Sequence, residues 1–167
     1  MMRWPGRIRA GSVCHEIAST IDLLPTIVSL TDAPKPRQRI DGVDIGPLLR
    51  EVAGARPRDH FLYYYTARKR DQLQAVRIGK WKLHVPHRYR SYLGGRAGRD
   101  GFPGPYAYSL TGHELYDLEQ DPGERRDVYS EHPEVVAQLM TLVESARADL
   151  GDVDRKGSGV RPVGRVK

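Results

Sequence analysis

The feature that most constrains this fold is an apolar stripe at helical spacing in the stretch "SEHPEVVAQLMTLVESARADLGD", residues 130–152. Apolar side chains recur there every three or four residues, at Val136, Leu139, Val143, Ala146 and Leu150. This spacing places them on one face of an α-helix. Pro133 suits the first turn of the helix, and Gly151 is placed to end it. A helix with one apolar face must bury that face, so the rest of the chain has to supply an apolar surface.

Candidate strands precede the helix and can supply that surface. The stretch "FLYYYTA", which begins at Phe61, is aromatic and strand-prone. "DQLQAVRIGKWKLHV" predicts two strands about a turn at 79–80. "HELYDLEQDPGE" is typical of a strand that ends in a turn, with Pro122 and Gly123 at the turn positions. The second half of the chain is therefore predicted to be mainly a small antiparallel sheet packed by a C-terminal amphipathic helix.

Between these strands lies "RYRSYLGGRAGRDGFPGPYAYSLTG", residues 88–112, which is rich in Gly, Arg and Tyr. It has no hydrophobic periodicity, so it is predicted to be a long irregular loop. Loops of this length inside a compact domain are uncommon and often functional.

The first 60 residues have a different character. "CHEIAST", residues 14–20, predicts a short strand. "DLLPTIVSLTDAP" predicts a short helix that begins near Asp22, with Pro25 in its first turn. Because that helix is almost wholly apolar, we expect it to be buried. The composition changes after "GARPRDH", residues 54–60, where the strand-prone region begins.

Charge and cysteine content exclude several classes of protein. The formal net charge is +6, which is compatible with binding to nucleic acid, an anionic membrane surface or an anionic substrate. Charges of both signs are interspersed along the sequence, however, and this pattern favours a protein with no acidic partner. Cys14 is the only cysteine, so a disulfide framework and the two-cysteine metal motifs are excluded. No apolar run is long enough to span a bilayer, and the N-terminus lacks the apolar core of a signal peptide.

The residues contain no self-sufficient catalytic set. His84 and His87 form "HVPH" and Arg88 follows them; two histidines are too few for a zinc site, so the candidate role for these three residues is contact with an anionic substrate. The two acids of "DPGE" are predicted to shape an exposed turn rather than to act as an acid/base pair. "RKR" at 68–70 beside three tyrosines leaves a nucleic-acid module open as a weaker alternative.

Six segments occur in the order typical of one family: "RWPGRIRAG", "STIDLLPTIVSL", "DGVDIGPLL", "AVRIGKWKLH", "ELYDLEQDPGERRDV" and "HPEVV". This order resembles the C-terminal part of the sulfatase family, especially bacterial arylsulfatases. The resemblance implies an α/β fold like that of alkaline phosphatase. Residues 1–55 would be a strand and helix remnant of the catalytic domain, 56–152 the C-terminal subdomain, and 153–167 a disordered basic tail.

The resemblance also implies what these residues lack. Family members use calcium and a formylglycine nucleophile made from the Cys of a C-x-P-S-R type motif. Cys14 lies in "SVCHEIA", which does not match that motif, and the family's calcium ligands lie upstream. We therefore expect no catalytic residue, metal or cofactor in this chain, and a missing N-terminal catalytic domain.

The expected function is thus that of a C-terminal sulfatase fragment: the parent is a sulfuric ester hydrolase acting on small or polymeric sulfate esters, and the chain alone is inactive. It would come from a truncated gene, a split gene or an engineered truncation. Parents of this family are usually exported to the periplasm, the exterior or the lysosome; neither nucleic acid nor a membrane is the expected partner. The alternatives are a stand-alone basic module that binds an anionic polymer, and a piece of a related phosphoesterase.

Overall fold

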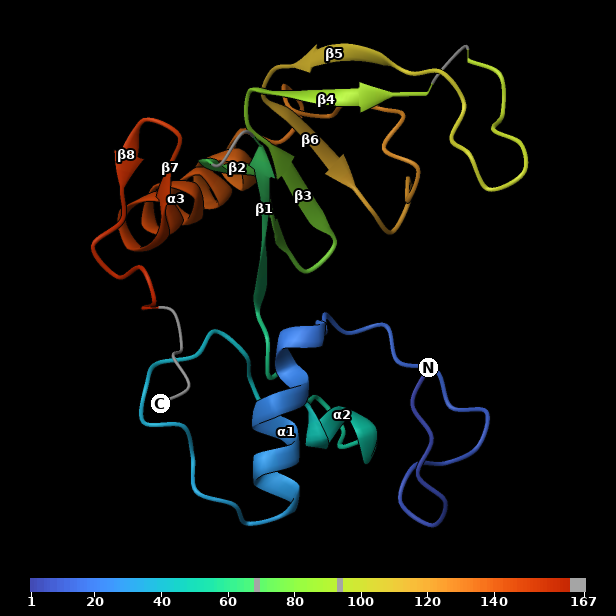
Figure 1. The fold of residues 1–167 in the computed structure, drawn as a ribbon, viewed down its shortest axis with the longest axis vertical. Helices are drawn as coiled ribbons and strands as arrows, with labels where there is room; N and C mark the ends of the chain where they lie inside the picture. Colours follow the sequence, from blue (N-terminus) through green and yellow to red (C-terminus); the bar gives the residue numbers. More distant parts are fainter. Residues whose placement is uncertain (68–69, 93–94, 163–167) are drawn as a thin grey trace. The chain divides into compact units, whose positions relative to one another are not determined.

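The structure, a computed structural model, describes residues 1–67, 70–92 and 95–162. It divides into two units (Figure 1). Residues 1–61 with 159–167 form the first, here called the N-terminal unit, and 62–158 form the second, here called the sheet unit.

The N-terminal unit contains little regular structure. A 3-10 helix, η1 (Thr20–Asp22), leads directly into α1 (Leu23–Leu30), and α2 (Gly46–Leu49) follows. The helix predicted near Asp22 is therefore present. The strand predicted at 14–20 is wrong, since residues 14–19 are irregular and Thr20 begins η1. A strand needs a hydrogen-bonded neighbour, and the described part of this unit offers none.

The apolar composition of α1 predicted burial, and in this chain alone the helix leaves apolar side chains exposed. Leu23, Leu24 and Ile27 are 41%, 52% and 57% exposed. The buried side of the helix instead carries polar Asp22 and Thr26. The Thr26 hydroxyl accepts a hydrogen bond from the Ile45 N–H at 3.0 Å. The helix thus packs its polar side on the segment before α2, and the side chains of Leu23, Leu24 and Ile27 stay about half-exposed.

A buried ion pair anchors this arrangement. Asp22 is fully buried and pairs with the guanidinium of Arg58. Its carboxylate also accepts the N–H groups of Ser19 at 2.8 Å and Val43 at 2.9 Å. Burial raises the pKa of Asp22, but the hydrogen bonds from Arg58 and these backbone groups outweigh it and hold the pKa below its usual value.

An antiparallel sheet forms the centre of the sheet unit, with strand order β1-β2-β3-β6. The strands are β1 (His60–Ala67), β2 (Arg70–Ile78), β3 (Trp81–His84) and β6 (Glu114–Asp117). β2 and β3 form the predicted hairpin: Ile78 pairs with Trp81, and Gly79 between them has φ +53°. A positive φ suits glycine, which has no Cβ to clash. In the next pairing, Leu83 of β3 lies opposite Leu115 of β6.

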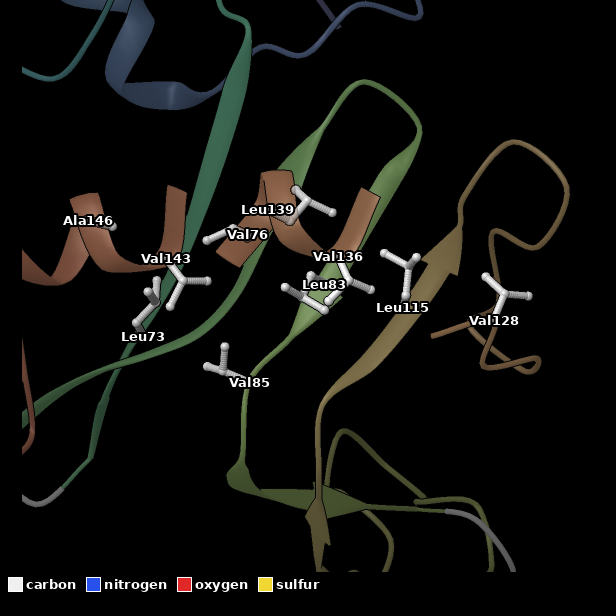
Figure 2. Close-up of a cluster of buried hydrophobic side chains, with 10 residues drawn as sticks. All are labelled: Leu73, Val76, Leu83, Val85, Leu115, Val128, Val136, Leu139, Val143 and Ala146. Carbon is white, nitrogen blue, oxygen red and sulfur yellow. The ribbon is translucent and has the colours of Figure 1, made fainter. Parts of the chain in front are cut away.

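One long helix, α3 (Pro133–Leu150), follows the sheet and ends at Gly151, whose φ is +90°. Its side chains Val136, Leu139, Val143 and Ala146 are buried in one cluster with side chains of the sheet (Figure 2). The cluster contains Leu73, Val76, Leu83, Val85, Leu115, Val128, Val136, Leu139, Val143 and Ala146. This apolar cluster is the core of the sheet unit, and it explains why the stripe recurs at helical spacing.

The segment at 88–112 differs from the irregular loop that we predicted. It contributes most of β4 (His87–Ser91) and all of β5 (Ala107–Thr111), which pair into a separate antiparallel ribbon. His87 lies opposite Thr111 and Ser91 opposite Ala107. Backbone hydrogen bonding between the two ends of the segment stabilises strands that have no alternation of polar and apolar side chains.

A second small ribbon follows α3. β7 (Gly151–Asp152) pairs with β8 (Arg155–Lys156), and the Ser158 N–H donates to the Ala148 carbonyl of α3 at 2.9 Å. Residues 153–158 thus differ from the disordered tail that we expected there. Residues 163–167 of that expected tail lie outside the described residues, as do Arg68 and Lys69 of the "RKR" segment.

Candidate functional site

The two histidines singled out in the sequence lie together in the sheet unit. His84 ends β3 and His87 begins β4, and their rings stack with centroids 5.5 Å apart and an interplanar angle of 17°. His87 is buried, and its Nδ1–H donates to the Val85 carbonyl at 2.7 Å. That bond fixes which ring nitrogen carries a proton, because a carbonyl can only accept.

Arg88, the third predicted residue, is separated from them by the alternation of the strand. His87 is buried on one face of β4, whereas Arg88 is exposed on the other. Its guanidinium lies over the ring of Tyr108, 3.9 Å from the centroid. The structure therefore brings His84 and His87 to one place and directs Arg88 away from it.

A residue of the "DPGE" turn reaches the histidines, which the sequence did not indicate. Glu124 accepts a hydrogen bond from the Lys82 ammonium at 2.6 Å and from His84 Nε2 at 2.7 Å. A carboxylate can only accept, so Nε2 of His84 carries the hydrogen. The turn itself is held by Asp121, whose carboxylate accepts the N–H groups of Arg125 and Arg126 at 2.5 and 2.8 Å.

The backbone at Glu124 has an uncommon conformation. Its φ is +51°, in the left-handed region that glycine adopts freely and other residues rarely. Asp32, Glu51 and Asp100 share this region, so the conformation alone assigns no role to the side chain. Here the side chain is the one acidic group that Lys82 and His84 share.

The electrostatics of this trio favour a charged Glu124 and a neutral His84. Burial raises the pKa of Glu124, but the hydrogen bond and charge of Lys82, then those of His84, outweigh it and lower the pKa. For His84, burial and the Lys82 charge lower the pKa more than Glu124 raises it. The short contact to Glu124 alone would favour an imidazolium; burial beside an ammonium is the stronger effect.

Calcium does not fit the residues described. Calcium takes six to eight oxygen ligands, and residues 1–67, 70–92 and 95–162 contain no group of three or more His, Cys, Asp or Glu side chains placed to hold a metal ion. Cys14 is exposed with a free thiol in the N-terminal unit. We therefore assign no step to a metal or to a modified cysteine in this chain. None of the described helices is both long and apolar enough to cross a membrane.

Comparison with known proteins places the chain in a family. The family model described as the C-terminal region of aryl-sulfatase matches residues 56–161. The chain belongs to the sulfatase family. A second model, for the C-terminal part of N-sulphoglucosamine sulphohydrolase, matches residues 1–91. The resemblance inferred from the six ordered segments is thereby confirmed, and the sulfatase region covers both units.

Curated relatives extend over most of the chain. Human "Arylsulfatase A" is 40% identical over 151 residues, which cover 83% of this chain and 28% of that protein. "N-acetylgalactosamine-6-sulfatase" of Canis lupus familiaris is 36% identical over 132 residues, which cover 73% of this chain and 24% of that protein. This sulfatase chain therefore spans about a quarter of the length of these relatives.

Solved structures agree on the fold. The PsFucS1 sulfatase from Pseudoalteromonas sp. aligns with a TM-score of 0.63 at 20% identity, covering 87% of this chain and 28% of that one. BT4656, solved with its substrate D-glucosamine-2-N,6-O-disulfate, aligns with a TM-score of 0.58 at 23% identity over 87% and 27%. At this identity the likeness shows the sulfatase fold, which is alkaline-phosphatase-like, and no more than the fold.

Proposed function

We propose that this chain is the C-terminal part of a sulfatase that hydrolyses sulfate esters, and that it forms part of the substrate cleft without supplying the reacting groups. The observation that supports this most is the match of residues 56–161 to the arylsulfatase C-terminal region. Hydrolysis in the family needs a nucleophile and a cation; the described residues form no cluster placed to hold a metal ion, and Cys14 does not lie in the family's nucleophile motif. Calcium, the formylglycine and the remaining catalytic domain belong to the rest of the enzyme.

Within that cleft, we propose that the pair His84 and His87 contacts the substrate near the sulfate ester. Glu124 holds the His84 ring through Nε2, which leaves Nδ1 as the hydrogen-bond acceptor of the neutral ring. His87 is held by the Val85 carbonyl. Rings held by such bonds are preorganised, so they bind a hydroxyl or ester group without first losing side-chain freedom. Arg88 serves as a separate contact on the other face of β4.

The test is substitution in the full-length enzyme that this proposal implies. His84→Ala and His87→Ala are compared with wild type on a small aryl sulfate and on a sulfated oligosaccharide. We expect kcat/KM to fall roughly tenfold or more, the cost of one lost hydrogen bond to a positioned group. His113→Ala is the matched control, because that histidine lies outside the pair and is exposed. Unchanged kcat/KM on both substrates would refute the role of the pair.

The division of the sequence is likewise a proposal. Residues 1–55 are assigned to the catalytic domain and 56–152 to the C-terminal subdomain, and export of the parent is expected from the family. The alternative of a stand-alone basic module rests on the net charge of +6. The alternative of a related phosphoesterase would show as hydrolysis of phosphate esters and not sulfate esters by the full-length enzyme.

A further inference from the structure

One face of the β4–β5 ribbon is buried at one end, at His87 and Thr111, and the opposite face is exposed and carries arginines and tyrosines. Residues directly opposite in an antiparallel pair point to the same side. Arg88 lies opposite Leu110 and Arg90 opposite Tyr108, so these four share a face, while His87 and Thr111 on the other face are buried. The exposed face, here called the Arg–Tyr face, consists of Arg88, Arg90, Tyr92, Tyr106, Tyr108 and Leu110 (Figure 1 shows the ribbon).

The arginine and tyrosine side chains of the Arg–Tyr face pack against one another across the two strands. The guanidinium of Arg88 lies over Tyr108, 3.9 Å from the ring centroid, and that of Arg90 lies over Tyr106 at 4.8 Å. The rings of Tyr106 and Tyr108 meet edge to face at 5.6 Å, and Tyr92 packs on Tyr106 at 5.8 Å. A hydrogen bond with Tyr108 raises the pKa of Arg90 and lowers that of Tyr108. Each arginine is thus held by an aromatic ring rather than by an acid.

The two guanidiniums remain available to an anion. Within the part of the chain that the structure describes, neither Arg88 nor Arg90 forms an ion pair with a carboxylate, although most other interactions of arginines in the sheet unit are with acids. The residues alternate along one strand, so their backbones are about 6.8 Å apart. Stacking leaves the N–H groups of Arg88 available for a two-pronged contact with an oxyanion, whereas Arg90 already donates one hydrogen bond to Tyr108 and has its other N–H groups for the anion.

We infer that the Arg–Tyr face binds a sulfated polysaccharide, with Arg88 and Arg90 contacting successive anionic groups along one chain. Two fixed cations on a flat ribbon match a ligand that carries sulfates at regular intervals, and engagement of both raises affinity through effective concentration. The tyrosine hydroxyls add hydrogen-bond donors for sugar oxygens. The choice of a sulfated glycan rests on the proposed function; the binding itself needs no hydrolysis.

Single-stranded nucleic acid is the less favoured occupant. Proteins of that class offer aromatic rings whose faces are open for bases to stack on. Here a face of Tyr106 and a face of Tyr108 are each covered by a guanidinium. This arrangement favours an oxyanion bound by the arginines over bases stacked on these tyrosines.

The experiment measures binding of the 167-residue chain to a fluorescein-labelled heparin dodecasaccharide by fluorescence anisotropy. The test variant is Arg88→Gln/Arg90→Gln. The control is Arg125→Gln/Lys156→Gln, which removes the same charge from two other exposed positions of the sheet unit. We expect the test variant to raise Kd roughly tenfold or more, as two charge-assisted contacts are lost, and the control to raise it less than about threefold. Arg88→Lys/Arg90→Lys should lie between them, because lysine keeps the charge and loses the fork.

Three results would overturn the inference: no binding of the dodecasaccharide, equal weakening in test and control variants, or equal affinity for the desulfated oligosaccharide. If a single-stranded oligonucleotide binds tightly and its binding depends on Arg88 and Arg90, the ligand of the Arg–Tyr face is nucleic acid and not a glycan. Melting temperatures of all variants show that each is folded. If binding fails while the full-length enzyme still hydrolyses a small aryl sulfate, the inference fails alone. If hydrolysis fails while glycan binding persists, the proposed function fails alone.

Discussion

Replacement of Glu124 by Gln tests whether the "DPGE" turn holds the candidate site together. The substitution keeps the size of the side chain and its backbone conformation but removes the charge shared by Lys82 and His84. The Lys82 side chain is only 13% exposed and that of Glu124 28%. The ammonium would therefore stay largely shielded from water without a counter-charge, which is costly.

The expected loss follows from this burial. A hydrogen bond to a charged group contributes about 1.5–3 kcal/mol, and breaking a fully buried pair costs about 3–5 kcal/mol. Because this pair keeps some contact with water, we expect Glu124→Gln to lower the free energy of unfolding by about 1.5–3 kcal/mol. For a unit of this size the melting temperature should fall on the order of 10 °C.

The assay is urea unfolding followed by the fluorescence of Trp81 in a Trp4→Phe background, so that the signal comes from the sheet unit. Glu119→Gln is the matched control. Glu119 is 68% exposed and 3.8 Å from Lys80, so its loss should cost less than about 0.5 kcal/mol. Equal effects of the two substitutions would refute the reasoning, because the effect would then owe nothing to the shared contact.

The effect of Glu124→Gln on stability should also depend on pH, in a direction that follows from the pKa shifts of Glu124 and His84. The folded pKa of Glu124 is lowered, so its contribution is present above its unfolded pKa of about 4.3 and is lost as pH falls through the folded value. The folded pKa of His84 is also lowered, so its contribution is present above about 6.5 and lost as pH falls. Without Glu124 the pKa of His84 falls further. The difference in the free energy of unfolding between wild type and Glu124→Gln should thus grow from pH 7 to pH 5 and shrink below pH 4.

Three further variants test other parts of the structure. Leu139→Ala should cost about 2–5 kcal/mol in urea unfolding, because it opens a cavity in the core of the sheet unit; a cost below about 1 kcal/mol would contradict the packing of α3. Asp22→Asn should lower the free energy of unfolding by about 3–5 kcal/mol, because it leaves Arg58 buried without its charged partner. The folded pKa of Asp22 is lowered, so this difference should be present above about pH 4 and vanish as pH falls through the folded value; a difference independent of pH would contradict it. Leu24→Gln/Ile27→Gln should reduce ANS fluorescence with little change in melting temperature, since both side chains are half-exposed; unchanged ANS fluorescence would show that α1 is covered.

Elements whose signal is local could be predicted from the sequence. The β2–β3 hairpin follows from a Gly79 turn between strand-prone runs, and α3 follows from a stripe of four buried side chains at helical spacing. Both depend on residues close together in the chain. The same locality made the family recognisable, because its short segments recur in a fixed order.

Elements that depend on distant contacts could not be predicted. Arg88 pairs with Leu110 across a Gly-rich segment. The exposed face of this ribbon carries aromatic side chains, so its strands lack the alternation of polar and apolar residues that predicts a strand. Glu124 meets Lys82 and His84 at sequence separations of 42 and 40, so the turn alone gave no sign of the contact. For α1 the apolar composition predicted burial, but Leu24 is 52% exposed in this chain, and composition could not show what would cover it.

The chain belongs to the sulfatase family, and we propose that the reacting groups lie in the rest of the enzyme. The most direct measurement is release of 4-nitrophenol from 4-nitrophenyl sulfate by the purified 167-residue chain, with calcium present and absent. We predict a rate equal to that of buffer under both conditions, because Cys14 lies outside the family's nucleophile motif and the described residues form no calcium site. Turnover above buffer that is abolished by Cys14→Ser or His84→Ala would contradict the account.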